Sequence, residues 1–198
     1  MGKLEFNKKR NESIIIAAAD KLFAEKGIEA TTISDIVKES GLARGTFYNY
    51  YKNKEEIWDR IIDDAMMEIS NKLKEERQKA SNIREFVYNS FIALAWILQE
   101  ETYLRFIMNN QTVLRKTLLS SEFLNPIYTD LENDFLNSSF YEGLAPSTLR
   151  MFGYSFVGAT IELIFQSYMN NDTMSPEEKA EFFTGLFIGG YKQLTHTF

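Results

Sequence analysis

The sequence predicts an all-α protein of about nine helices. Its 198 residues include only 3 prolines and 10 glycines, which is few for a β-sheet protein rich in tight turns. Apolar residues recur at helical spacing along most of the chain, and no segment shows the alternation typical of a half-buried strand. A chain of this length can bury a sizeable core in one or two domains.

The composition excludes several kinds of site. Because the chain has no cysteine, disulfide frameworks and thiolate zinc sites are excluded. Its single histidine is His196, and no cluster of histidine and carboxylate residues accompanies it, so we expect no catalytic residue, no metal site and no cofactor. No stretch approaches the roughly 18 apolar residues of a membrane span, and no signal peptide is recognisable. We therefore expect a cytoplasmic protein without membrane contact.

The acidic net charge is unevenly distributed. Residues 1–60 hold 11 Lys/Arg and 10 Asp/Glu, a net of +1, whereas the other 138 residues hold 11 and 18, a net of −7; together they give −6. Because contact with phosphates requires only a local basic face, the overall charge does not exclude a nucleic-acid partner.

The first 53 residues are expected to form three helices. Gly27 supplies a left-handed residue after the first helix, and Thr32 and Asp35 resemble the capping box of the second, which ends near Gly41. The first helix is expected over 9–26, with a buried face that contains Ile15, Ile16, Ala19, Leu22 and Phe23.

Two short helices joined by a tight glycine turn are typical of a helix-turn-helix. Asn53 is a good N-cap for the following helix, so only about residues 44–51 remain for the helix after Gly41. In a helix-turn-helix, the second short helix enters the major groove of DNA. This interpretation predicts a three-helix DNA-binding domain over residues 1–53.

The rest of the chain predicts six more helices. A helix over 54–78 would extend about 37 Å at 1.5 Å per residue, long enough to link two domains. The polar end of this linking helix favours a domain boundary there, with residues 79–198 as a second helical domain. The later helices are expected over about 83–100, 102–109, 121–137, 147–169 and 176–194, the last with Ser175 as its cap.

The segment "ATTISDIVKESGLARGTFYNYYKNKEEIW" resembles the DNA-binding signature of the tetracycline-repressor (TetR) family. The resemblance extends back through "AAADKLFAEKG" and covers about residues 12–62, with paired threonines, a Gly-x-x-x-Gly-Thr-aromatic-Tyr run and an aromatic-x-x-Lys-Glu-Glu run at unchanged spacing. It implies a homodimeric transcription regulator. The C-terminal domain of such a regulator binds a small molecule between its helices and pairs with its mate through the last two helices.

The resemblance assigns phosphate contacts on the DNA operator. Tyr48, Tyr50 and Lys54 match positions that hold phosphate, and Thr32 matches a position that assists at the start of the second helix. Gly45 lacks a Cβ, so the DNA backbone can come close to it. Such contacts position a duplex without reading its sequence.

Three further residues match positions that face the major groove, namely Arg44, Thr46 and Asn49. An arginine can read guanine, an asparagine can pair with adenine, and a threonine methyl can contact thymine. Phe47 and Tyr51 match packing positions. The alternative is a helical hairpin whose tyrosines all pack in a core.

The C-terminal part contains no motif of comparable specificity, although 13 of the 16 phenylalanines lie after residue 79. Most of these aromatic residues are expected to be core, and some could line an apolar pocket. Glycines in the last two helices favour close helix packing, either in a dimer interface or within one subunit. The candidate ligand-binding residues are Trp96, Phe106, Tyr128, Glu162 and Gln166, with solvent or an internal partner as the alternative for Glu162.

Three functions are open from the sequence. The first is a homodimeric repressor released from a palindromic double-stranded DNA operator by a small apolar or aromatic effector. The second is a coactivator or adaptor that keeps the TetR-like head but acts through a partner protein. An enzyme is the third, and it lacks the residues that metal and nucleophile mechanisms require.

Overall fold

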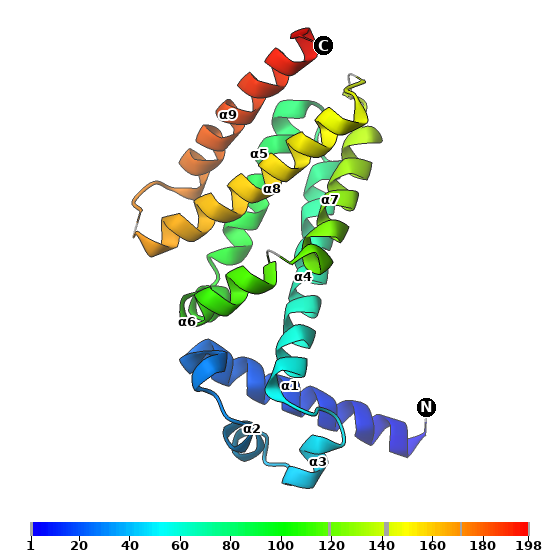
Figure 1. Ribbon diagram of the computed structural model, residues 1–198, viewed down its shortest axis with the longest axis vertical. Helices are drawn as coiled ribbons and strands as arrows, with labels where there is room; N and C mark the ends of the chain where they lie inside the picture. The colour runs from blue at the N-terminus through cyan, green and yellow to red at the C-terminus, as the bar shows by residue number, and fades with distance from the viewer. Residues whose placement is uncertain (1, 119, 141–142, 171, 198) are drawn as a thin grey trace. The chain divides into compact units, whose positions relative to one another are not determined.

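The computed structural model describes residues 2–118, 120–140, 143–170 and 172–197. Within these ranges the chain forms nine α-helices and no strand, which confirms the predicted all-α class (Figure 1). No helix in the described ranges combines the length and apolar character needed to cross a membrane. The helices are α1 (Lys3–Ala30), α2 (Ile33–Ser40), α3 (Arg44–Tyr48), α4 (Lys54–Gln78), α5 (Ile83–Leu98), α6 (Glu101–Leu118), α7 (Ser121–Leu136), α8 (Pro146–Met169) and α9 (Pro176–Thr197).

The described chain divides into two compact units. The head unit holds the described residues up to Glu68 together with Glu100–Arg115, and the body unit holds Ile69–Gln99 and the described residues from Lys116 onwards. The chain therefore changes unit within α4, between α5 and α6, and again within α6. These units group residues by contact, whereas the predicted division into 1–53, 54–78 and 79–198 concerns roles and stays a prediction.

Apolar faces of α1 to α4 form the core of the head unit. Phe23 of α1, Ile36 of α2 and Phe47 of α3 are all buried in it. Trp58 of α4 stacks on Phe106 of α6, with ring centroids 5.2 Å apart and an interplanar angle of 16°. The core of the head unit thus includes α6, which follows α4 and α5 in the chain.

Gly27 ends the regular part of α1, although not in the conformation that the sequence predicted. Its φ of 80° and ψ of 156° lie in a region open to glycine alone, whereas the prediction was the left-handed helical region. A Cβ on this residue would lie 2.5 Å from the carbonyl oxygen of Asn109 on α6. The close approach of α6 therefore requires glycine here. The helix also begins at Lys3, six residues before the expected start.

α6 is longer than the helix predicted over 102–109, because Asn110 bends the helix without ending it. The backbone of Asn110 is non-helical (φ −127°, ψ 17°), and α6 continues to Leu118. Its buried amide accepts a hydrogen bond from the Ile28 N–H at 2.7 Å. The same amide donates to the carbonyl oxygens of Phe23 and Phe106, each at 2.8 Å. This amide holds α6 against the end of α1.

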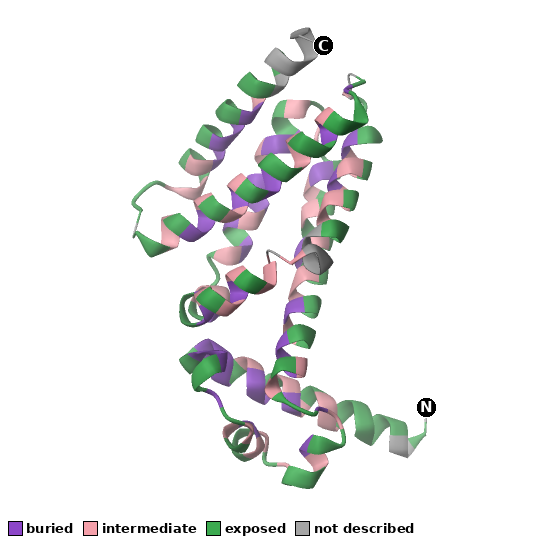
Figure 2. Cartoon of the chain, viewed as in Figure 1, coloured by how far each residue is buried: buried purple, intermediate pink, exposed green. Residues whose placement is uncertain are grey.

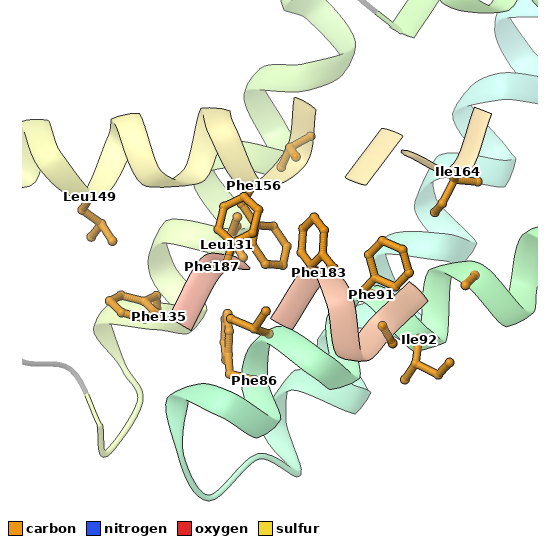
Figure 3. Close-up of a cluster of buried hydrophobic side chains, with 14 of the residues drawn as sticks. Phe86, Phe91, Ile92, Leu131, Phe135, Leu149, Phe156, Ile164, Phe183 and Phe187 are labelled. Atoms are coloured by element: carbon orange, nitrogen blue, oxygen red, sulfur yellow. The ribbon is translucent and has the colours of Figure 1, made fainter. Parts of the chain in front are cut away.

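The core of the body unit is a cluster of phenylalanines from α5, α7, α8 and α9 (Figure 3). Phe183 is fully buried, and its ring centroid lies 4.6 Å from that of Phe91 and 5.1 Å from that of Phe156. A buried ion pair between Arg77 and Asp134, with 2.6 Å between Nη2 and Oδ2, ties α4 to α7. Most aromatic residues of this unit therefore pack in its core, as the sequence analysis expected.

The ends of the other helices lie close to the predicted positions. α3 is the largest exception among the short helices, because it ends at Tyr48 rather than near residue 51. Ser175 and Glu178 form the expected cap of α9. The Ser175 hydroxyl accepts from the Glu178 N–H at 3.1 Å, and the Glu178 carboxylate accepts from the Ser175 N–H at 2.7 Å.

Candidate nucleic-acid interface and apolar groove

The start of α2 is held by a complete capping box. The Thr32 hydroxyl accepts from the Asp35 N–H at 3.2 Å and donates to the Asp35 carboxylate at 2.8 Å, which also accepts from the Thr32 N–H at 2.9 Å. Lys26 pairs with the same carboxylate at 2.8 Å. The bond from Lys26, followed by those from Thr32, holds the pKa of Asp35 below its usual range. These bonds confirm the capping box and fix the start of α2 beside the end of α1.

α3 has one buried face and one exposed face. Phe47 is 1% exposed and Tyr51, just beyond the helix, is 8% exposed, so both pack as expected. Burial, with a smaller contribution from the Glu12 carboxylate, raises the pKa of Tyr51 to about 12. Ala43 caps the helix without a side-chain hydrogen bond. The anchored phenylalanine determines which side of this five-residue helix faces outward.

The outward face of α3 gathers most of the predicted DNA-contacting residues. Arg44, Gly45, Tyr48 and Asn49 are exposed (Figure 2), whereas Thr46 is partly buried. The Arg44 guanidinium carbon lies 5.9 Å from the centroid of the Tyr48 ring, a cation–π contact that aligns the two side chains. A Cβ on Gly45 would meet no atom within 4 Å. The chain itself therefore does not require glycine at this position, but a closely approaching partner could. Tyr50, in the turn after the helix, is also partly buried.

Lys54 has a structural partner that the sequence did not indicate. Its ammonium group donates to the carbonyl oxygens of Ile28 at 2.6 Å, Thr31 at 2.8 Å and Glu29 at 3.3 Å. These carbonyls belong to the end of α1 and the residue after it, where a cation is electrostatically favoured. A phosphate bound by Lys54 would have to compete with these bonds. Phosphate contact by Lys54 therefore stays a prediction.

An apolar groove of about 350 Å³ lies between α7 and α8 in the body unit. Its floor includes Phe86, Phe135 and Phe152. Tyr128 and Tyr154 line it from opposite helices, with ring centroids 4.6 Å apart in an edge-on arrangement. Polar side chains also line it, namely Asn125, Thr129, Glu132 and Arg150. The volume is within the range of small-molecule sites, and both aromatic and polar side chains line the groove.

The five predicted ligand-binding residues do not come together. Tyr128 lines the groove, whereas Phe106 belongs to the core of the head unit. Trp96 is exposed, and its indole N–H donates to Glu177 at 3.2 Å. Glu162 is exposed and accepts from Gln166 at 2.6 Å, one turn further along α8.

Several groove residues were missed by the sequence analysis, notably Arg150 and Tyr154. Their spacing of four residues places them on one face of α8. That spacing was visible in the sequence, but nothing local shows which face of a helix borders a groove.

Both α8 and α9 carry exposed apolar side chains. Phe182 and Leu186 of α9 are 59% and 58% exposed, and Met151 of α8 is 59% exposed. A Cβ on any of four glycines in these helices would meet no atom within 4 Å. Close packing within the subunit is therefore not what these four glycines serve in the described structure; they are Gly158, Gly185, Gly189 and Gly190.

Comparison with known proteins finds a family match within the head unit. Residues 15–61 match the family described as "Bacterial regulatory proteins, tetR family". This range begins within α1, includes α2 and α3, and ends in the first part of α4. It contains every residue that the sequence analysis assigned to DNA contact.

Two curated relatives illustrate the extent of the similarity. "Uncharacterized HTH-type transcriptional regulator YhgD" of Bacillus subtilis (strain 168) is 31% identical over 83 residues, which are 42% of this chain and 44% of the relative. The "HTH-type transcriptional repressor KstR2" of Mycolicibacterium smegmatis is 20% identical over 190 residues, which are 93% of this chain and 91% of the relative. In the first curated relatives that it matches, the chain spans less than half of their length.

The fold is shared with solved structures. The transcriptional regulator FadR from Bacillus subtilis, solved in complex with stearoyl-CoA, superposes with a TM-score of 0.70 over 90% of this chain and 98% of that chain, at 22% identity. A FadR from Bacillus halodurans gives the same TM-score at 20% identity, over 88% and 93% of the two chains. Likeness at this level of identity establishes the fold.

Proposed function

We propose, from the premise that the chain belongs to the tetR family of bacterial regulatory proteins, that it is a homodimeric cytoplasmic repressor rather than an enzyme. A small apolar or aromatic effector would release it from a palindromic DNA operator. The observation that carries this proposal is the division of α3 into a buried and an exposed face. Arg44 and Tyr48 stand exposed on a helix that Phe47 anchors in the core, and Asn49 stands exposed directly after it, so they can enter a major groove without unfolding the head unit.

The exposed residues suit distinct parts of a duplex. The Arg44 guanidinium can make a bidentate contact with guanine, and the Asn49 amide can make one with adenine. The hydroxyls of Tyr48 and Tyr50 suit phosphate oxygens, and Gly45 leaves room for the sugar–phosphate backbone. Sequence reading and positioning are thus served by different side chains of the same short segment.

The test is selection of bound DNA from a random duplex pool at about 0.15 M salt, where nonspecific attraction is already weakened. The wild type would be compared with Arg44→Ala/Asn49→Ala. The control is Lys74→Ala/Asn133→Ala. Like the test variant, it removes one positive charge and one asparagine, but from exposed positions of the body unit. We expect wild type and control to enrich one palindrome. The test variant should lose at least about 30-fold in affinity for it, since each base contact contributes about 1–3 kcal/mol. If the wild type enriches no sequence, the repressor proposal fails and a protein-binding adaptor becomes the better interpretation.

A second copy of the chain is the proposed partner of the exposed apolar side chains of α8 and α9. Phe182, Leu186 and Gly189 recur at helical spacing on α9, so they share one face. Large exposed apolar side chains beside open glycines allow the backbones of two helices to approach closely. A symmetric dimer would present two α3 helices to half-sites about one helical turn of DNA, or 34 Å, apart.

The dimer face can be tested by sedimentation equilibrium. Leu186→Asp should dissociate the dimer, because it places an unpaired charge in an apolar interface. The control is Met67→Asp, at a methionine of α4 that is 65% exposed in the head unit. Equal dissociation of both variants, or of neither, would contradict an interface through α8 and α9.

The groove between α7 and α8 is the proposed effector site. Its phenylalanine floor suits an apolar or aromatic body. Arg150 lines the groove, is exposed, and has no acidic partner within the described residues, so it can bind an acidic group of the effector. An effector would release DNA only to the extent that it binds the DNA-free state more tightly than the DNA-bound state.

Matched probes can test the effector site. Decanoate and decanamide share an apolar chain, and 4-phenylbutyrate and its amide share an aromatic one. We expect the acids to raise the melting temperature more than the amides, and Arg150→Gln to remove the difference. Equal stabilisation by acid and amide would contradict the role of Arg150.

A further inference from the structure

We propose that the first turns of α1 form a second DNA-contacting surface, in which Lys8 and Lys9 bind phosphates of the duplex next to α3. This inference rests on the proposed DNA-binding function and extends it to a segment outside the matched family range of residues 15–61.

The first turns of α1 project from the head unit as an exposed helix. α1 begins at Lys3, and from Glu5 onwards, where burial is described, its first fully buried residue is Ile15. Figure 1 shows these turns extending past α3, and residues 5–10 within them are exposed. We call residues 5–14 the overhang. Because the overhang is helical, its side chains point in fixed directions, whereas those of a flexible arm would not.

Glu12 locates the overhang relative to α3. The Tyr51 hydroxyl donates to the Glu12 carboxylate at 3.4 Å, so this face of α1 lies against the segment that follows α3. Lys8 and Lys9 precede Glu12 by four and three residues, and residues at these spacings lie on the same side of a helix, about one turn of 5.4 Å away. By this spacing, Lys8 and Lys9 lie on the side of α1 that faces the segment after α3.

The charges of this surface are available to a partner. Several other cations of the head unit are paired, for example Lys21 with Glu39 at 2.6 Å and Arg60 with Asp64 at 2.9 Å. Lys8 and Lys9 are exposed and have no such partner within the described residues. Residues 2–11 contain four Lys/Arg but only one acidic residue, Glu5. Phosphate is the complementary group that a duplex held on α3 would bring to this position.

The helical form of the overhang favours phosphates over base edges. An α-helix with its side chains is about 10–12 Å wide, whereas the minor groove is about 6 Å wide. The overhang therefore cannot enter the minor groove beside the major groove that α3 occupies. Lysine is also suited to phosphate as a mobile point charge rather than to bidentate reading of a base.

The salt dependence of DNA binding provides the test, measured on the full chain with its selected palindrome and with a random duplex. Each phosphate contact contributes about −0.9 to the slope of log K against log salt concentration. Lys8→Ala/Lys9→Ala should reduce the magnitude of the slope by about 1.8 per subunit, and should weaken binding to both duplexes by a similar factor.

Two controls test whether the change in slope depends on the positions of Lys8 and Lys9 or only on the loss of positive charge. Arg10→Ala removes an exposed cation from the opposite side of the same helix, because Arg10 precedes Glu12 by only two residues. Lys74→Ala/Lys116→Ala removes the same charge as the test variant from exposed positions of the body unit. Neither control should change the slope by more than about 0.5. All substituted side chains are exposed, so circular dichroism should show unchanged helix content.

The outcomes separate this inference from the proposed function. If the wild type selects a palindrome but Lys8→Ala/Lys9→Ala leaves the slope unchanged, the overhang does not bind phosphate and only the inference fails. A loss confined to the palindrome would also overturn it, since that result indicates base reading. If the wild type selects no sequence at all, the proposed function fails, and the inference fails with it.

Discussion

Both units have an apolar core, and in each unit buried polar contacts also join distant helices: the Arg77–Asp134 ion pair in the body unit and a larger set of hydrogen bonds in the head unit. In the head unit, directed polar bonds join elements distant in sequence: Asn110 bonds to the end of α1, and Lys54 bonds to three carbonyls there. In the body unit, a cluster of phenylalanines from four helices forms the core. Hydrogen bonds require particular donors and acceptors at fixed distances, whereas apolar packing tolerates many combinations of similar volume.

The located match to a known family falls in the head unit. Identity reaches 31% over 83 residues in one relative but is 20% over 190 residues in another, and the matched family range lies entirely in the head unit. If α3 meets DNA as proposed, directed bonds would hold it in one orientation. A body that packs by volume can vary in sequence while its helices keep their arrangement.

The largest expected effect tests the packing of the body unit. Phe183→Ala should lower the free energy of unfolding by about 4 kcal/mol, because Phe183 is fully buried and its removal leaves a cavity. Phe183→Leu, which keeps most of the volume, should cost less than about 1.5 kcal/mol. Urea denaturation would measure both. Equal losses for the two variants would show that volume is not what this position contributes.

The second effect tests the polar bonds of the head unit. Asn110→Ala should cost about 3 kcal/mol, because the Ile28 N–H and the Phe23 carbonyl lose their partner in a buried site. Gln111→Ala, which removes an amide from the next position of α6, should cost less than about 0.5 kcal/mol. Hydrogen exchange should show faster exchange at the end of α1 in the first variant only. Unchanged protection there would contradict the assignment of Asn110 as the residue that holds α6 to α1.

The third effect shows whether glycine at position 45 is required for folding or for DNA binding. Gly45→Ala should leave the free energy of unfolding unchanged or raise it by about 0.5–1 kcal/mol, because a Cβ there meets open space and alanine favours helix. The same substitution should weaken operator binding if the DNA backbone approaches this position closely. Gly27→Ala is the opposite case, since it should destabilise the free chain through its positive φ and the contact with Asn109. Undiminished operator binding by Gly45→Ala would remove the close approach from the proposed interface.

The smallest effect is a pH dependence at the start of α2. The pKa of Asp35 in the folded chain is held below its ordinary value of 3.8, mainly by the bond from Lys26. Its contribution to stability is therefore complete above pH 3.8 and is lost as the pH falls below that value. Asp35→Asn should flatten the acid limb of the stability curve, whereas Asp63→Asn, at an exposed carboxylate elsewhere in the head unit, should leave that limb unchanged. An identical acid limb in wild type and Asp35→Asn would contradict this account.

The sequence by itself determined that the chain is helical and where two of the helix caps lie. The box of Thr32 with Asp35 and that of Ser175 with Glu178 join residues three positions apart, so the local chain contains both partners. The same holds for the buried face of α3, where helical spacing separates Phe47 from its exposed neighbours. The TetR-like signature lies in one continuous stretch, and a sequence comparison could therefore identify it.

Only the tertiary structure decided which helices meet and which faces border a groove. Asn110 reaches Ile28 across 82 positions of the chain, and Lys54 reaches the same residue across 26. Phe106 could not be separated from Tyr128 as a pocket residue, because both follow the same apolar periodicity. Periodicity shows that a face is apolar, but whether that face meets a core, a groove or a second subunit depends on helices that are distant in the sequence.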